Sequence, residues 1–401
     1  MAEQLVSLVE KALKEKILPA WNNQVLYEAD PFLDKVKKVA LDNYQIRAAA
    51  DIGINGGSAA GTENAYIPDA AAQMYEDFKI KPVYLYHTIG FSDFATQVAN
   101  SSANAIIPIV KKETEGAYEA CKWHLGRQLF MDGKGILAKV NAATGATNTV
   151  TVDSVKYLVP GLVVDFYANG AAVGTDPAIK GRRILNVNYM EKKITFDGAA
   201  TAVSAGFITN QNSYGHEVFG LGALYDTANI NEVYGVERSA NKNAYLNPES
   251  RSAQNDISDV IIGEMIRNSR RIHGTKTNLV MMGDAAFAAY QTYMKVNNVQ
   301  IVENQQFKGG FRGFEVLYND MTATVINGQY VPDNEVWGVD TNTFEWHSTG
   351  WRFATAEGSP AFQRRDGSSV YEALIANYGN LICSNPGGIW RLTDAQAADK
   401  D

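Results

Sequence analysis

Histidine and cysteine, which most often serve as metal ligands, nucleophiles or proton carriers near neutral pH, are rare in this sequence. The 401 residues include five histidines and two cysteines, namely His87, His124, His216, His273, His347, Cys121 and Cys383. No histidine stands at metal-ligand spacing from another histidine or from a cysteine. Two cysteines cannot build a disulfide framework, so we interpret these side chains as packed or surface residues and the thiols as reduced.

Motifs for catalysis or phosphate binding are also missing. There is no G-x-S-x-G elbow. The "GKG" at 133–135 lacks the other residues of a P-loop, and "GINGG" at 53–57 lacks the third glycine of a dinucleotide fingerprint. Glu113 and Glu115 fall on the solvated side of a predicted helix, which favours surface charge over an acid and base pair. The sequence therefore predicts no enzyme, no metal and no cofactor.

The length indicates a folded chain of two or three domains, or of one core with large insertions. Hydrophobic residues make up 46% and charged residues 20%, and the net charge is −8. No basic run is longer than a pair such as Arg270–Arg271 or Lys192–Lys193, which is too short for a protein that reads DNA sequence. No signal peptide and no apolar run of membrane-spanning length is present, so we expect no membrane partner.

A long segment rich in glycine and alanine interrupts the first quarter of the chain. Residues 55–69, "NGGSAAGTENAYIPD", contain no Lys or Arg. The flanking residues 42–50 and 71–91 have the alternation of extended strands. Two extended arms joined at such a tip predict a long hairpin, and a lone hairpin is not stable in water. We therefore expect it to lie on another surface.

Helical periodicity marks two segments near the beginning. Residues 3–16 predict a short amphipathic helix that needs a partner surface, either in its own chain or in a neighbouring subunit. Residues 106–131 predict the longest helix, with Ala117, Cys121, Leu125 and Leu129 on one apolar face. Asp132–Gly133 should end that helix.

The sequence pattern changes at residue 139 and again after residue 215. Residues 139–215 contain five or six short β-type runs, which predict a small barrel or sandwich inserted as a module. A mixed α/β pattern follows, with a helix capped by Asn255 or Asp256 and ended by Gly274, then the buried strand "NLVMM". Residues 344–393 read as strands.

Four segments in this order carry a family resemblance. They are "QLFMDGKG" at 128–135, "DVIIGEMIRNSRRIHGTKTNLVMMGDAAFAAYQTYM" at 259–294, "GFEVLYND" at 313–320, and "ALIANYGNLICSNPGGIWRL" at 373–392. With the hairpin and the long helix, this order resembles the major capsid protein of tailed bacteriophages, the Hong Kong 97-like fold. The resemblance covers nearly the whole chain as architecture, although Glu315 replaces a proline of the family pattern.

The resemblance implies an α+β fold with a defined division of the chain. The expected parts are an N-terminal arm (1–44), an extended loop (45–91), a peripheral domain with the spine helix (92–138), a β-barrel insertion (139–215), an axial domain (216–343), and returning peripheral strands with the C-terminus (344–401). The implied function is self-assembly into the icosahedral shell of a phage head. The virion is the implied location, and the host cytoplasm the site of synthesis.

Contacts between subunits are the expected site in such a protein. The candidates are the loop and arm residues Asn55, Gly56, Gly57, Glu63, Tyr66, Ile67, Leu5 and Leu8. The expected partners are copies of the same chain in hexamers and pentamers, portal and scaffolding proteins, packaged DNA without sequence-specific contacts, and a decoration protein as a further candidate. Glycine and alanine at the tip would let the loop follow a neighbour's surface closely.

This sequence differs in two ways from the type member of the Hong Kong 97-like family, and both differences change what we expect of the shell. We expect no fused scaffolding segment, and therefore a separate scaffolding protein. Residues 39–78 contain no Lys, so we expect a shell without the Lys–Asn isopeptide bonds of the type member. Two alternatives stay open at this point: an encapsulin-type compartment shell, and a β-rich glycan-binding protein using 139–215.

Overall fold

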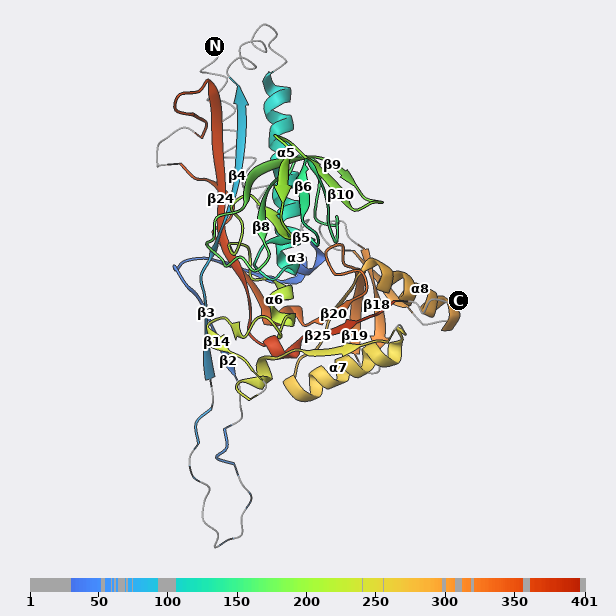
Figure 1. Cartoon of the computed structure of the whole chain (residues 1–401). Coiled ribbons are helices and arrows are strands. Elements are labelled where there is room, and N and C mark those ends of the chain that lie inside the picture. Colours follow the sequence, from blue (N-terminus) through green and yellow to red (C-terminus); the bar gives the residue numbers. More distant parts are fainter. Residues whose placement is uncertain are drawn as a thin grey trace. The chain divides into compact units, whose positions relative to one another are not determined.

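The computed structural model describes residues 30–51, 55–58, 60, 63, 69, 71–73, 75–92, 106–239, 241–254, 256–297, 301–306, 312–318, 321–355 and 361–396. The chain divides into two compact units. We call the unit formed by Met1–Gly126 and Ala223–Asp401 the body, and the unit Arg127–Gly222 the module. Figure 1 colours both along the sequence.

The body contains a seven-stranded sheet. Its order is β15-β25-β20-β16-β19-β18-β17. The strands are β15 (Glu249–Ser252), β16 (Leu279–Met282), β17 (Ile301–Gln306), β18 (Arg312–Tyr318), β19 (Met321–Asn327), β20 (Val336–Val339) and β25 (Trp390–Thr393). All four residues of β16 are buried, between parallel β19 and antiparallel β20. The buried strand predicted at "NLVMM" is thus confirmed.

Two helices pack on this sheet, α7 (Asp259–His273) and α8 (Asp284–Asn297) (Figure 1). One apolar cluster joins Ile262, Met265 and Ile266 of α7 to Tyr290 of α8 and to the sheet. Gly274 ends α7 at φ +68°, as the sequence predicts. The predicted start was wrong, because Ser258 is the N-cap residue.

A second sheet of the body surrounds the 14-residue strand β24 (Val370–Cys383). Its other strands are β1 (Lys37–Ala40), β4 (Val83–Ser92), β21 (Phe344–Ser348), β22 (Arg352–Phe353) and β23 (Gln363–Arg364). β4 and β24 run antiparallel from the pair Val83↔Gly379 to the pair Ser92↔Val370, and Figure 1 shows them side by side. The last strand of the chain, β25, belongs to the other sheet.

The spine helix α5 (Ile106–Phe130) has 25 residues and is therefore about 37 Å long. The apolar face predicted from its periodicity is buried at Ala117, Cys121, Leu125 and Leu129. The predicted long helix is confirmed.

The hairpin arms predicted at 42–50 and 71–91 are present in part, because residues 83–91 of the second arm belong to β4, which pairs with β24 and not with the first arm. β2 (Ile46–Asp51) pairs with β3 (Tyr75–Ile80) in an antiparallel ladder that runs from Ile46↔Ile80 to Asp51↔Tyr75. Short elements complete the body and its junction with the module: α3 (Pro31–Lys35), α6 (Leu221–Tyr225), β13 (Glu232–Val233), β14 (Val236–Glu237), η2 (Ala244–Leu246), η3 (Thr341–Thr343) and η4 (Pro386–Gly388).

The module is an antiparallel β structure. A six-stranded sheet has the order β5-β12-β8-β9-β10-β7, and β6 pairs with β11. The strands are β5 (Ile136–Val140), β6 (Thr144–Thr147), β7 (Thr149–Thr151), β8 (Val163–Ala168), β9 (Ile179–Asn188), β10 (Lys193–Phe196), β11 (Thr201–Val203) and β12 (Gly206–Asn210). Each of the six strands contributes to one core, through Leu137, Val150, Val164, Ile184, Ile194 and Ile208 among others.

The predicted closed barrel is not confirmed. The six-stranded path ends at β5 and β7, and no ladder joins these two strands in the module, all of whose residues are described. Asp153, just after β7, bonds to Lys139 of β5 through its backbone N–H (3.0 Å) and through its carboxylate (2.7 Å). β7 has only three residues, and its ladder is with β10.

Candidate functional site

The hairpin β2–β3 presents the predicted contact residues to solvent where they are described. Asn55, Gly56 and Glu63 are exposed and Gly57 is partly exposed. The Gly57 amide donates to Oδ1 of Asn55 at 2.9 Å, a local turn that needs no other element. The other four candidates, Tyr66, Ile67, Leu5 and Leu8, lie outside the described residues.

The root of the hairpin is held firmly by the body. Phe78 of β3 is fully buried, and its ring centroid lies 5.5 Å from that of Tyr234. The Lys79 amide donates to the Tyr234 carbonyl at 2.7 Å. Just beyond β3, the Asn380 side chain donates to the Lys81 carbonyl at 3.0 Å. These contacts fix the base of the hairpin.

Tyr234 itself is held at the tip of the small hairpin β13–β14. Tyr234 and Gly235 both have positive φ, +52° and +84°, as a two-residue type I′ turn requires. Tyrosine is disfavoured in this region of backbone space, so its surroundings must hold it there. The Cys383 amide donates to the Tyr234 hydroxyl at 3.0 Å, and burial raises the pKa of that hydroxyl.

Arg238 anchors the same small hairpin from inside the body. Its side chain is almost completely buried and donates to the carbonyls of Ala223, Leu224, Asp226 and Ile230 at 2.7 to 3.3 Å. The carbonyls at the end of a short helix lack intrahelical partners, and the planar guanidinium satisfies several of them together. Arg238 thereby ties α6 to the turn that holds the hairpin root.

An aromatic patch covers the outward face of β4 and β24. Tyr84 and Tyr86 are half exposed, and Tyr378 lies across the ladder with its ring 5.0 Å from that of Tyr84. The Arg352 guanidinium stands over the Tyr378 ring at 5.1 Å, a cation–π arrangement. An exposed aromatic surface of this kind suits contact with another protein.

In the module, the residues that follow the spine helix contact the residues that follow the last strand, β12. Gly133 and Gly135 have φ of +82° and +79°, and the Glu217 amide donates to the Gly133 carbonyl at 3.3 Å. The Arg127 guanidinium and the Glu217 carboxylate form a fully buried ion pair at 2.5 Å. The "DGKG" turn predicted to end the helix therefore also closes the module.

The shifted pKa values of the buried cysteines and histidines indicate structural roles for these side chains. Burial raises the pKa of Cys121 and of Cys383 to about 12, so both thiols stay protonated and unreactive near neutral pH. Burial lowers the pKa of His87 and of His273. Among the described residues, no three His, Cys, Asp or Glu side chains are placed to hold a metal ion, and no described helix is long and apolar enough to cross a membrane.

Sequence reasoning did not find Tyr234, Arg238 or the Arg127–Glu217 pair. The two members of that pair are 90 residues apart, and their partnership leaves no local pattern. The "YG" at 234–235 was the one available signal, because adjacent positive-φ residues in a tight hairpin favour glycine at the second position.

Comparisons with known proteins show the fold. The chain resembles a solved structure titled "Cyanophage A-1(L) capsid asymmetric unit", with 10% identity, a TM-score of 0.55, and coverage of 92% of this chain and 94% of that one. A native GTA particle capsid (TM-score 0.45, 11% identity, 92% and 91% covered) and the SrpI encapsulin of Synechococcus elongatus PCC 7942 (0.46, 7%, 91% and 88%) are more distant.

The fold assignment rests on the cyanophage capsid, because the other two likenesses fall below a TM-score of 0.5. The α+β, Hong Kong 97-like capsid fold predicted from the sequence is confirmed. Searches with protein-family models and against curated proteins found no match.

Proposed function

We propose that this chain is the major capsid protein of a tailed bacteriophage. It self-assembles as hexamers and pentamers into the icosahedral head shell that encloses double-stranded DNA, and the virion is where it acts. The observation that carries the proposal is a capsid fold with a long hairpin whose root is fixed and whose tip residues Asn55, Gly56 and Glu63 are exposed.

The physical reason for assembly lies in this hairpin. A two-stranded ribbon is at best marginally stable in water without a surface to cover it. The body buries Phe78 at the root, whereas Tyr75, at the far end of the ladder, is 63% exposed. A neighbouring subunit supplies the missing surface. Obligate contacts between subunits bury more than about 2,000 Å², and repetition over many copies lets each contact be modest.

The other partners follow from charge and from the need to build a closed shell. A net charge of −8 favours a wall that does not grip DNA, since like charges repel within a Debye length of about 8 Å. The shell therefore encloses packaged DNA without making sequence-specific contacts to it. A portal protein and a separate scaffolding protein complete assembly, and a decoration protein is a further candidate partner.

An encapsulin-type shell is the alternative function, because one capsid-like fold serves both kinds of particle. The contents of the particle separate the two. A phage head holds double-stranded DNA, whereas a compartment shell holds a cargo protein. Particles purified from the natural source that contain protein cargo and no DNA would favour the compartment. The chain is proposed to have no enzymatic activity in either case.

Electron microscopy of the purified full chain tests the proposal. With scaffolding protein supplied, the chain should form closed shells. The matched control replaces residues 52–74 by an Asn-Gly turn between the paired residues Asp51 and Tyr75, which removes the tip and keeps the ladder. That variant should stay unassembled but folded. A wild-type chain that remains monomeric at high concentration with scaffold would overturn the proposal.

A further inference from the structure

The β9–β10 hairpin of the module has a strand edge that no other strand covers. The β8–β9 ladder ends at Arg183. The last backbone bonds on that side join Ile184 to Gly161 and Leu162. Residues 185–188 of β9 therefore have a neighbouring strand only on the β10 side in the module, all of whose residues are described. We call this segment the open edge. An uncovered edge leaves backbone N–H and C=O groups available to an added strand.

The open edge lacks the charged residue or proline that usually protects an uncovered strand. Its sequence, "LNVN", contains neither Lys nor Pro, although native proteins commonly place these residues on exposed edges. Leu185 lies at a bulge in the β9–β10 ladder, where it has no partner residue on β10, and its side chain is 57% exposed. Bulges re-aim side chains. An apolar side chain is thus presented beside unpaired backbone groups.

The tip of the hairpin adds further apolar surface. Tyr189 and Met190 are 59% and 94% exposed. The Asn188 side chain accepts hydrogen bonds from the Met190 and Glu191 amides at 3.1 Å each, so these side chains stand on an ordered turn. A turn that is already ordered loses less conformational entropy when a partner binds. Together with Leu185, the tip carries three of the four large apolar side chains exposed on the module, which indicates a protein-binding surface.

Positive charge accompanies this apolar surface. The hairpin, residues 179–196, contains five cations and one acidic residue. Two of the lysines form ion pairs, with Asp176 at 2.7 Å and with Glu191 at 2.8 Å. The other three cations pair with no carboxylate of the described chain; they are Arg182, Arg183 and Lys192. In a chain of net charge −8, this local excess favours an acidic partner.

Arg182 is the clearest case, because it is partly buried. Its guanidinium reaches the Asp197 carbonyl and the Thr201 hydroxyl only at 3.4 Å each, and its buried Nε has no hydrogen-bond partner. The planar fork of a guanidinium matches the two oxygens of a carboxylate. The unused donors of Arg182 therefore indicate a carboxylate supplied from outside the module.

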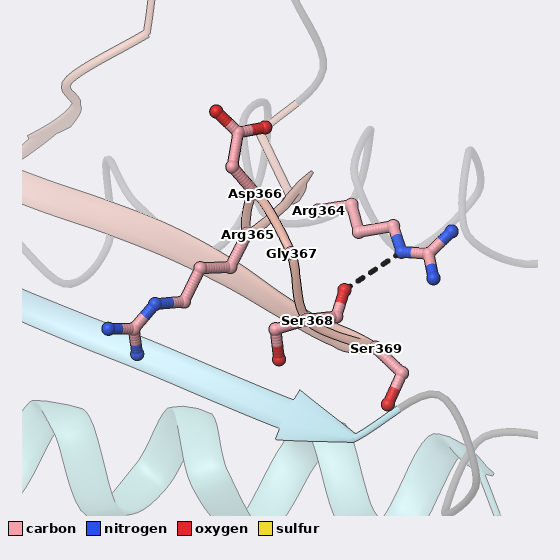
Figure 2. Close-up of a pocket in the computed structure, with 6 residues that line it drawn as sticks. All are labelled: Arg364, Arg365, Asp366, Gly367, Ser368 and Ser369. Carbon is pink, nitrogen blue, oxygen red and sulfur yellow. Dashed lines mark hydrogen bonds between the residues drawn. The ribbon is translucent and has the colours of Figure 1, made fainter.

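A pair of arginines in the β23–β24 turn of the body is different. Figure 2 shows Arg364 and Arg365 pointing to opposite sides of this turn, which lines a cleft of about 400 Å³. Arg365 already pairs with Glu372 at 3.4 Å. Arg364 donates to the Ser368 carbonyl at 2.9 Å. Because these cations diverge and one of them has a carboxylate, the turn is a suitable control.

We propose that the open edge and the tip of the β9–β10 hairpin bind an extended acidic segment of another protein. The segment adds a strand beside residues 185–188, so that its main chain supplies affinity and its alternating side chains supply specificity. Its apolar side chains meet Leu185 and Met190, and its carboxylates meet Arg182 and Arg183. Nucleic acid is also anionic, but it has no peptide backbone that can extend a β-sheet. The inference concerns the module and does not depend on the proposed function.

Binding of a labelled peptide to the full-length, unassembled subunit tests the inference. The probe is a short peptide of alternating Val and Glu, and its control alternates Val and Lys. Fluorescence anisotropy should show binding of the Glu peptide only. Added salt should weaken that binding, because it screens the charges of the hairpin.

Two changes in the hairpin should each weaken binding of the Glu peptide at least about tenfold. Leu185→Asn removes the apolar contact, and Arg183→Gln with Lys192→Gln removes charge. All three side chains are exposed, so each variant should fold, which circular dichroism checks. The matched controls, which should bind as the wild type does, are Val173→Asn, at the other exposed apolar residue of the module, and Arg364→Gln with Arg365→Gln.

The same variants separate the competing partners. A wild type that does not bind the Glu peptide, or that binds the Lys peptide equally well, overturns the inference, and so do hairpin variants that bind as tightly as the wild type. If labelled single-stranded DNA binds more tightly than the Glu peptide and the hairpin variants lose it, the partner is nucleic acid and the inference is wrong. If the hairpin variants abolish self-association of the subunit, the partner is a second copy and the inference is also wrong. Failure of the wild type to form shells bears on the proposed function alone.

Discussion

The buried ion pair of the module offers a quantitative test of how the spine helix is joined to the inserted β structure. Arg127 is the fourth residue from the end of α5, and Glu217 follows the last strand of the module. Their side chains are 0% and 2% exposed and lie 2.5 Å apart. We consider replacing each by methionine, singly and together, to remove the charge while keeping an apolar side chain of comparable length.

The expected magnitudes follow from two opposing free energies. At 2.5 Å and an effective dielectric constant of about 20, the attraction between two unit charges is about 7 kcal/mol. Taking the two ions out of water costs several kcal/mol for each ion, so the pair as a whole contributes little. Removing one member leaves an uncompensated buried charge and should cost about 3–5 kcal/mol. Replacing both should cost less than about 2 kcal/mol.

Hydrogen exchange measured by mass spectrometry is the suitable assay, because no tryptophan lies in residues 127–222 and tryptophan emission therefore reports on the body. The Gly215 and Glu217 amides donate to the carbonyls of Lys134 and Gly133. A loss of about 4 kcal/mol in opening free energy accelerates their exchange about a thousandfold. Arg183→Met, which changes an exposed arginine of β9, is the control and should leave exchange unchanged.

The reasoning fails if Arg127→Met and Glu217→Met each accelerate exchange less than about tenfold, since a buried charge would then be tolerated alone. It also fails if the double variant is as unstable as the sum of the two single variants. That result would mean that the two side chains stabilise the module independently, not as a pair.

Two further predictions concern the body. Burial raises the pKa of Asp30 to about 7, against the lowering effect of the Phe32 amide bond. The folded chain therefore holds a proton that the unfolded chain, with a pKa of about 3.9, releases. The free energy of unfolding should then fall, by an amount on the order of 4 kcal/mol, as pH rises from about 4 to about 7. Urea midpoints at pH 5 and pH 8 should differ for the wild type and differ less for Asp30→Asn, and an equal difference in both would contradict the assignment. Arg238→Lys keeps the charge but loses the planar fork to four carbonyls, and should lower the free energy of unfolding by about 3 kcal/mol. Tryptophan emission during urea unfolding measures the loss, with the exposed Arg251→Lys as control, and an unchanged midpoint would refute the role of Arg238.

Local pattern in the sequence was enough to predict the elements. Alternation around "NGGSAAGTENAYIPD" predicts the arms that pair as β2 and β3, and the apolar stripe through Leu125 and Leu129 predicts the spine helix. These predictions succeed because strand alternation and helical periodicity are set by the few residues nearest in the chain. Even so, the capping residue of α7 was misplaced, because Ser258 and not Asn255 or Asp256 is the N-cap.

Tertiary structure alone decided which distant residues meet. Phe78 packs against Tyr234, and Arg127 pairs with Glu217. The members of each pair are so far apart in the sequence that no helical or strand periodicity connects them. The same holds for the module, where six strands share one core but β5 and β7 do not close into a barrel. Closure depends on strand length and register summed around the whole sheet. The sequence by itself therefore determined the parts and their order, and the long-range packing determined how the hairpin root is held and which charges are left facing outward.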